Sequence, residues 1–170
     1  MLNVRDLRVS YGMSEVIHGI DLDVGENETV AIMGRNGMGK TTTIACITRM
    51  MAANSGRIAF AGQDLSRLPS HRAARLGLGF VPEGRRAFSG LTVRENLELS
   101  YPKGRNVFGS LFFKVTDEVN ARVMAVAEDI FLSDRLDTSA GLLSHGQKQW
   151  LEIGMLLIQD PELLMLDEPV

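Results

Sequence analysis

The sequence predicts an α/β fold in which a glycine-rich loop joins a buried strand to a helix. Residues 28–33 form a short apolar run without alternation and lead into the glycine-rich stretch 34–39, a pattern typical of a strand buried on both faces. Residues 41–51 contain no Gly or Pro and end at a turn-forming Asn-Ser-Gly, so they are predicted to be helical. A second apolar run, 163–166, ends in two acidic residues and predicts another buried strand.

The N-terminal residues predict two half-buried antiparallel strands. Apolar side chains recur there at about every second position with polar residues between them, which is the spacing of a strand with one buried face. The apolar positions are Leu2, Val4, Leu7 and Val9 in the first strand, and Ile20, Leu22 and Val24 in the second.

The middle of the chain predicts shorter elements. Residues 57–60 fit a strand, 65–76 a basic amphipathic helix, and 78–81 a brief strand that a proline stops. Residues 89–114 mix aromatic residues, Pro and Gly, so we expect a loop-rich insertion with one helix at about 93–99.

Two helices are predicted before the final strand. The first has apolar residues at helical spacing, namely Val119, Val123, Val126 and Ile130. The second is expected to begin after Ser144, a residue type that caps helix N-termini. Its apolar residues Trp150, Ile153 and Leu157 share one face.

Composition limits the class of protein. The 170 residues correspond to one domain, and 45% hydrophobic with 23% charged residues is the balance of a folded domain. A net charge of −3 offers no broad surface for nucleic acid, so no nucleic-acid partner is expected. No apolar run approaches the roughly 18 residues of a membrane span, and no export signal is recognisable. The single cysteine, Cys46, agrees with a reducing compartment.

The glycine-rich stretch satisfies the P-loop pattern of Gly, any four residues, Gly, Lys and Ser or Thr. It consists of Gly34, Arg35, Asn36, Gly37, Met38, Gly39, Lys40 and Thr41. Backbone N–H groups in such a turn converge on phosphate oxygens, and the following helix directs its positive dipole end at the same anion. Lys40 is expected to pair with the β- and γ-phosphates and Thr41 to hold Mg²⁺.

The acids that end the last strand fit the same chemistry. Asp167 is placed to hold Mg²⁺ through water, and Glu168 to polarise an attacking water molecule. An Asn-Lys-x-Asp guanine motif is absent from the sequence, so ATP is expected rather than GTP.

The segment Leu143-Ser144-His145-Gly146-Gln147 resembles the LSGGQ signature of ATP-binding cassette (ABC) proteins. With the P-loop before it and the acidic pair after it, in the family's order, the whole chain resembles an ABC nucleotide-binding domain. The resemblance implies that Ser144, Gly146 and Gln147 form a second phosphate cradle at a helix N-terminus. In the family this cradle faces the ATP of another cassette, so a second cassette is an expected partner.

The resemblance assigns further residues. Tyr11 matches the aromatic residue that stacks on adenine, although a tyrosine at the margin of the core is the alternative. Thr42 joins the P-loop residues in the phosphate cradle. Glu83 stands where the family's Q-loop usually has Gln, and its carboxylate is a candidate Mg²⁺ ligand. His145 replaces the first signature glycine and receives no catalytic role.

Within the family the chain resembles the cassettes of branched-chain amino-acid and urea importers. Residues up to about 96 look like the smaller cassette of such systems, and the later residues look like its partner cassette. The resemblance implies transmembrane permease subunits as partners, a periplasmic binding protein indirectly, and a cytoplasmic location on the inner face of the membrane. A soluble ABC ATPase that acts on DNA or ribosomes, and a fragment that binds ATP without turnover, remain alternatives.

Two clusters of residues each have two alternative interpretations. A basic cluster is either a solvated face or, at Arg85 and Arg86, part of the contact with a membrane subunit. Its other members are Arg67, His71, Arg72 and Arg75. Several apolar residues form either a groove for a partner helix or a small satellite core. They are Phe88, Leu91, Val107, Phe108, Leu111 and Phe112.

We expect one incomplete domain with a β part and P-loop core at 1–88, a helical subdomain with the signature at 89–150, and a return to the core at 151–170. Cassettes of the family continue past the acidic pair into a dimer-contacting loop, a core strand and a switch histidine. Because that strand lies beside the one that feeds the P-loop, we expect these 170 residues alone to be unstable and poorly active.

Overall fold

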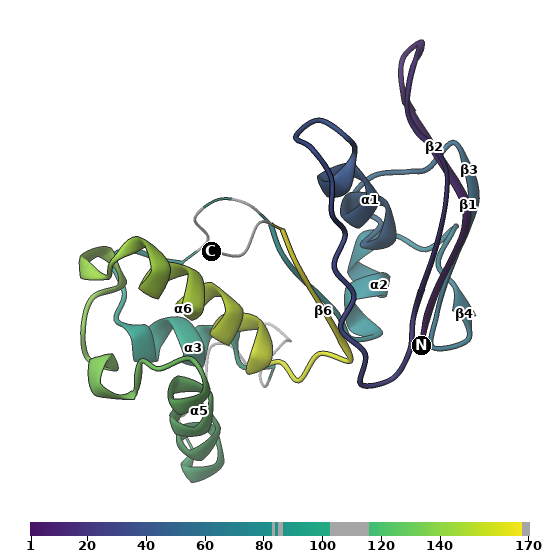
Figure 1. Cartoon of the computed structure of the whole chain (residues 1–170). Coiled ribbons are helices and arrows are strands. Elements are labelled where there is room, and N and C mark those ends of the chain that lie inside the picture. The colour runs from purple at the N-terminus through teal and green to yellow at the C-terminus, as the bar shows by residue number, and fades with distance from the viewer. Residues whose placement is uncertain (83, 85–86, 103–115, 168–170) are drawn as a thin grey trace. The chain divides into compact units, whose positions relative to one another are not determined.

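The computed structural model describes residues 1–82, 84, 87–102 and 116–167 (Figure 1). It contains two compact units, Met1–Phe80 and Val81–Val170. None of the helices in the described ranges combines the length and the hydropathy needed to cross a membrane.

The first unit is built on a four-stranded antiparallel sheet with strand order β2-β1-β3-β4. Its strands are β1 (Leu2–Tyr11), β2 (Ser14–Val24), β3 (Ser55–Phe60) and β4 (Gln63–Asp64). The two predicted N-terminal strands and the predicted strand at 57–60 are therefore confirmed. The apolar alternation in β1 skips one position between Val4 and Leu7, where the register shifts and Asp6 has φ 42°. A β-bulge of this kind returns Leu7 and Val9 to the buried face.

Two helices lie on the same side of this sheet (Figure 1). The helix predicted at 41–51 is α1 (Lys40–Ile47), which ends early because Arg49 takes the left-handed conformation with φ 60°. The helix predicted at 65–76 was too long: α2 comprises only Ser70–Arg75. Pro69 precedes it and has no N–H to continue a helix backward, while the N–H of Leu65 donates to the Ile58 carbonyl instead.

The strand predicted at 28–33 is wrong. These residues form no strand, and Val30, Ile32 and Met33 are 38%, 36% and 90% exposed instead of buried on both faces. A strand exists only where its N–H and C=O groups find a neighbouring strand, and no described strand pairs with this segment.

The second unit is mainly helical. It contains α3 (Val93–Ser100), α5 (Asp117–Asp129), η1 (Ser133–Arg135), η2 (Ala140–Leu142) and α6 (His145–Leu157). The strand β6 (Leu163–Leu166) follows, as predicted. The predicted strand at 78–81 is β5 (Leu78–Val81), whose last residue begins the second unit. After β6, the backbone N–H of Asp167 donates to the Val81 carbonyl at 3.0 Å.

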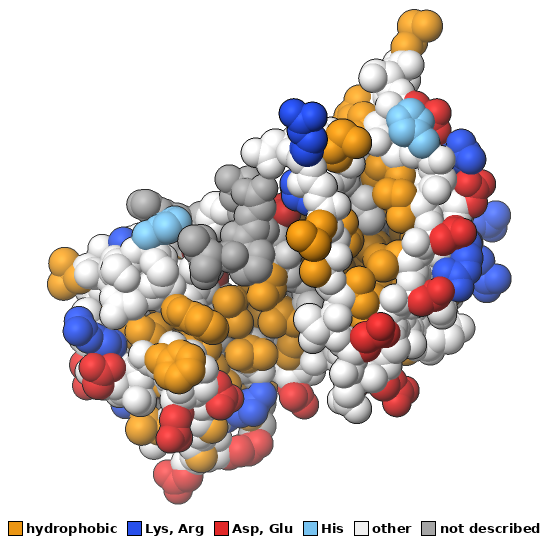
Figure 2. Space-filling model, in the orientation of Figure 1, with side chains coloured by type: hydrophobic (Ala, Val, Ile, Leu, Met, Phe, Trp, Pro, Cys, Tyr) orange, Lys and Arg blue, Asp and Glu red, His pale blue; other side chains and the backbone are white. Residues whose placement is uncertain are grey.

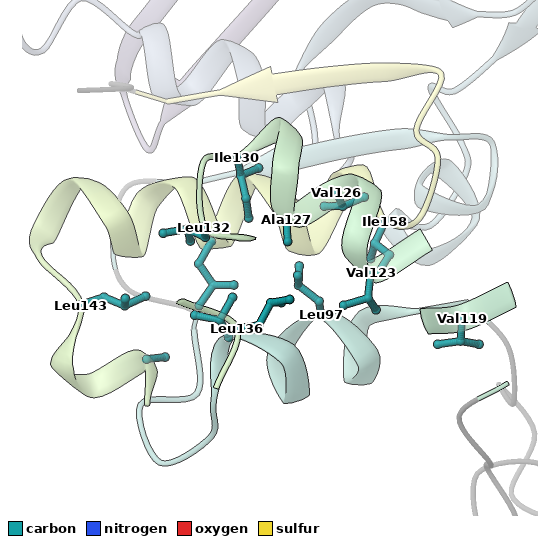
Figure 3. Packing of buried hydrophobic residues seen from close by; sticks show 13 residues of the cluster. Leu97, Val119, Val123, Val126, Ala127, Ile130, Leu132, Leu136, Leu143 and Ile158 are labelled. Atoms are coloured by element: carbon teal, nitrogen blue, oxygen red, sulfur yellow. The ribbon is translucent and has the colours of Figure 1, made fainter. Parts of the chain in front are cut away.

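The helices of the second unit enclose one hydrophobic core. Figure 3 shows Leu97 from α3, Val123 and Val126 from α5 and Ile158 after α6 packed together. α6 buries Leu151 completely but leaves Trp150 41% exposed, so the face expected from Trp150, Ile153 and Leu157 is not the one most buried. Phe131 stacks edge-on against Trp150, with ring centroids 5.8 Å apart. Figure 2 shows in orange the hydrophobic side chains that remain exposed on one face of the molecule.

Two leucines on α3 test this packing. Replacing Leu97, which is fully buried, with Ala should lower the free energy of unfolding by about 2–5 kcal/mol, because it leaves a cavity in the core. The same replacement at Leu99, 61% exposed on the same helix, should change it by less than about 0.5 kcal/mol. Denaturant unfolding followed by the fluorescence of Trp150, the only tryptophan, measures both. Equal losses in the two variants would contradict the assigned packing.

Candidate functional site

The P-loop residues form an exposed turn at the start of α1. Gly39 is the N-cap residue of this helix and has φ 86°, a left-handed conformation that suits glycine. A side chain at this position would also crowd Ile17, whose Cγ1 lies 3.2 Å from the place of a Cβ. Gly39 offers no capping side chain, so the first N–H groups of α1 are left to water or to an anion.

Lys40 holds the same turn through its side chain. Its ammonium group donates to the carbonyl of Gly34 at 2.9 Å and approaches that of Arg35 at 3.4 Å. The N–H of Met38 donates to the Arg35 carbonyl at 3.2 Å and closes the tip of the loop. The ammonium group is thus kept inside the curve of the loop, where phosphate oxygens can replace the carbonyls as its partners.

The remaining predicted residues of the first unit lie near solvent. Thr41 is exposed and Thr42 is partly exposed in the first turn of α1. Asn36 and Gly37 are exposed at the tip of the loop. Tyr11 ends β1 and is 56% exposed, which leaves its ring available for stacking rather than placing it in the core.

Asp167 is the predicted metal ligand of the second unit that lies within the described residues. It follows β6, is only 5% exposed, and its Oδ2 atom has no hydrogen-bond partner within the described part of the chain. A buried carboxylate oxygen without a partner is costly, and a cation or a water molecule bound to one removes that cost. The donor chemistry of Asp167 therefore fits Mg²⁺, which prefers oxygen ligands.

The signature residues start α6 as predicted. The Ser144 hydroxyl accepts a hydrogen bond from the Gln147 N–H at 3.3 Å, and the Gln147 side chain accepts one from the Ser144 N–H at 3.0 Å. This reciprocal pair is a capping box. His145 and Gly146 are exposed in the first turn. The capping box fixes where the helix begins and leaves its N-terminal surface open to solvent.

Several predictions fall outside the described residues. Glu83, Glu168, Arg85 and Arg86 are among them, as are four members of the predicted apolar groove, Val107, Phe108, Leu111 and Phe112. Of the groove residues that are described, Phe88 is 52% exposed and Leu91 is partly buried.

Two polar features of the second unit were not predicted from the sequence. Lys148 donates to the Gly141 carbonyl at 2.9 Å, and nothing in the sequence indicates this. Thr92 and Glu95 form a second capping box, at the start of α3, which the spacing Thr-x-x-Glu before an apolar helix signals. The Thr92 N–H bonded to Glu95 lowers the pKa of that carboxyl below its usual value.

Comparison with known proteins identifies relatives of the whole chain. Residues 17–170 match the family model described as ABC transporter. BraG of Pseudomonas aeruginosa, a high-affinity branched-chain amino acid transport ATP-binding protein, is 36% identical over 171 residues, with 99% of this chain and 69% of BraG covered. LivF of Archaeoglobus fulgidus, a probable branched-chain amino acid transport ATP-binding protein, is 31% identical, with coverages of 99% and 68%.

Other matches are of different kinds. The phosphonates import ATP-binding protein PhnC 1 of Rhodopseudomonas palustris is 33% identical, with 99% of this chain and 63% of that protein covered. Among solved structures, the ADP conformation of MJ1267, an ATP-binding cassette of an ABC transporter, superimposes with a TM-score of 0.84 at 29% identity. That match covers the whole of this chain and 69% of MJ1267.

The Ser144 cap gives a test of how α6 begins. Ser144→Ala should lower the free energy of unfolding by about 0.5–2 kcal/mol, because the Gln147 N–H loses its acceptor. Ser144→Thr keeps the hydroxyl and should recover most of the loss. Unfolding followed by Trp150 fluorescence reports on α6 itself, since Trp150 lies on it. An Ala variant as stable as the unchanged chain would show that the cap contributes nothing.

Proposed function

Because this chain belongs to the ABC transporter family, we propose that it is the ATP-binding and ATP-hydrolysing subunit of an importer. The observation that carries the proposal is the P-loop. An uncapped helix start, a left-handed glycine and a lysine held inside the loop together form a cradle for phosphate.

The predicted residues have distinct roles in binding and hydrolysing the nucleotide. Lys40 and the N–H groups at the start of α1 bind the β- and γ-phosphates and stabilise the charge that develops on them. Tyr11 stacks on the adenine ring, and Gly34 to Thr42 surround the phosphates. Asp167, the Thr41 hydroxyl and Glu83 are the candidate ligands for Mg²⁺, which when bound would neutralise phosphate charge. Glu168 accepts a proton from the attacking water.

The signature residues lead us to propose that the active protein is a dimer. Ser144, Gly146 and Gln147 lie at the start of α6, where the capping box leaves the N-terminal surface facing solvent as a second candidate phosphate cradle. This cradle, which lies in the second unit, binds the ATP that another cassette holds. Turnover therefore requires a homodimer or a heterodimer. The P-loop, in the first unit, binds nucleotide without it.

The transported substrate is proposed from the relatives. BraG and LivF carry names for branched-chain amino acid transport, which makes these amino acids the first candidates, with urea as the second from the signature string. PhnC 1 carries a name for phosphonate import, so the cassette alone leaves the substrate class open. The proposed setting is the cytoplasmic face of the membrane, on permease subunits that a periplasmic binding protein supplies.

Lysine substitutions test the nucleotide site. Lys40→Ala should weaken Mg-ATP binding by roughly 10- to 100-fold, the contribution of hydrogen bonds between charged groups. Lys148→Ala is the matched control, because that ammonium group also donates to a backbone carbonyl at 2.9 Å but lies outside the P-loop. Titration with a fluorescent ATP analogue measures both affinities. Equal affinities in the two variants would remove Lys40 from the site.

A glutamate pair tests hydrolysis separately from binding. Glu168→Gln should reduce phosphate release by at least roughly 100-fold while ATP still binds, because only the general base is lost. Glu162→Gln, at an exposed acid six residues earlier, should leave both properties unchanged. Undiminished release in Glu168→Gln would overturn the role of Glu168. ATP binding without phosphate release in the unchanged chain would favour the fragment that binds without turnover.

A further inference from the structure

The strongest feature outside the P-loop is a short segment of the second unit, residues 87–92, which we call the connecting segment. It follows the predicted Q-loop position and leads into α3. Side chains and backbone groups from α3, η2 and α6 all bind its backbone.

Asn96 binds the connecting segment most extensively. Its side chain is completely buried, although Asn usually lies at the surface. Its Oδ1 atom accepts from the Phe88 N–H at 2.8 Å, and its Nδ2 atom donates to the carbonyls of Phe88 at 3.1 Å and Thr92 at 2.8 Å. One amide thus satisfies both backbone groups of Phe88, as a neighbouring strand would.

The signature helix binds the start of the same segment. Glu152, on α6, is 7% exposed, and its Oε1 atom accepts a hydrogen bond from the Ala87 N–H at 3.2 Å. Asn96 and Glu152 therefore hold consecutive residues, Ala87 and Phe88, from two different helices. Because the side chains of Asn96 and Glu152 are buried, these contacts are partly shielded from competing water.

The next residues bind the chain just before the signature. The Ser89 carbonyl accepts from the Ser139 hydroxyl at 2.9 Å and from the Gly141 N–H at 3.0 Å, and the Leu91 carbonyl accepts from the Ala140 N–H at 2.8 Å. Gly141 is needed for this approach, because a Cβ there would lie 2.9 Å from the Ser89 carbonyl oxygen.

The contact continues into the signature helix. The Gly141 carbonyl accepts from the Lys148 ammonium group, one turn into α6. A displacement of the Ser89 carbonyl would move Gly141, which lies three residues before Ser144 and is tied to α6 by Lys148. Hydrogen bonds thus join the connecting segment to Gly141, just before α6, and to Glu152, in the middle of that helix.

We propose that Asn96 is a positioning residue for the signature. It fixes the Phe88 backbone, and through Ser89 and Gly141 it sets the position of Ser144 at the start of α6. Asn96 is not itself a catalytic residue, since its side chain is buried and, among the described residues, bonds to backbone groups. The catalytic consequence rests on the proposed function, whereas the structural link does not.

Native-state hydrogen exchange, read at single amides by NMR on the full chain, tests the link. In Asn96→Ala, the Ala140 and Gly141 amides should exchange roughly five- to tenfold faster relative to the α5 amides, because the carbonyls that they bind lose their support. Val123→Ala is the matched control. Val123 lies in the same core but makes none of these hydrogen bonds, so its loss should not single out those two amides.

A milder variant keeps the test decisive if Asn96→Ala fails to fold. Ser139→Ala removes one of the two donors to the Ser89 carbonyl and should speed exchange of the Gly141 amide by roughly threefold. Unchanged exchange at Gly141 in the folded variants, or an increase equal to that in Val123→Ala, would overturn the proposal.

The catalytic consequence has its own measurement. Asn96→Ala and Ser139→Ala should bind the fluorescent ATP analogue with unchanged affinity, because the P-loop lies in the other unit, but should release phosphate more slowly. Unchanged release together with faster exchange would overturn the link between the connecting segment and catalysis. Absence of release in the unchanged chain would count against the proposed function, while the exchange result would still decide the structural proposal.

Discussion

The N–H groups at the start of α1 need a partner, and no side chain in the described part of the chain caps them. Gly39 has no side chain to supply one, and its left-handed conformation turns the backbone so that the helix begins there. Lys40 meanwhile takes the loop's own carbonyls as acceptors. A phosphate group would accept hydrogen bonds from the N–H groups of α1, and it would compete with the loop carbonyls for the Lys40 ammonium group. The chemistry of the site therefore follows from backbone groups as much as from side chains.

In the second unit, side chains supply the partners of backbone groups at the helix starts and in the connecting segment. Its helix starts at Thr92 and Ser144 are both closed by capping boxes, so their positions in the chain are well defined. Asn96 and Glu152 together supply polar partners that the irregular backbone at 87–92 would otherwise lack. A hydrophobic core of aliphatic side chains holds the helices together, and the buried polar contacts decide where the connecting backbone lies (Figure 3).

The sequence was most informative where a local pattern has a local cause. Alternation predicted β1 and β2, helical spacing predicted α5, and Ser144 predicted the start of α6. It failed where the outcome depends on distant partners. Residues 28–33 have strand composition but no described neighbour to pair with, and Trp150 looked like a core residue although α6 buries Leu151 instead. The P-loop and signature were found from their spacing, whereas the hydrogen bonds of Asn96 join residues whose pairing no spacing rule gives.

The most direct measurement of the central claim is the response of single backbone amides to Mg-ATP, recorded by NMR on the full chain. The amide signals of residues 34–42 should shift strongly on addition of nucleotide. The amide signals of α5, which carries none of the proposed nucleotide-binding residues, should stay in place. Amides 34–42 that do not respond, while others in the chain do, would contradict the assignment of the phosphate site to the start of α1.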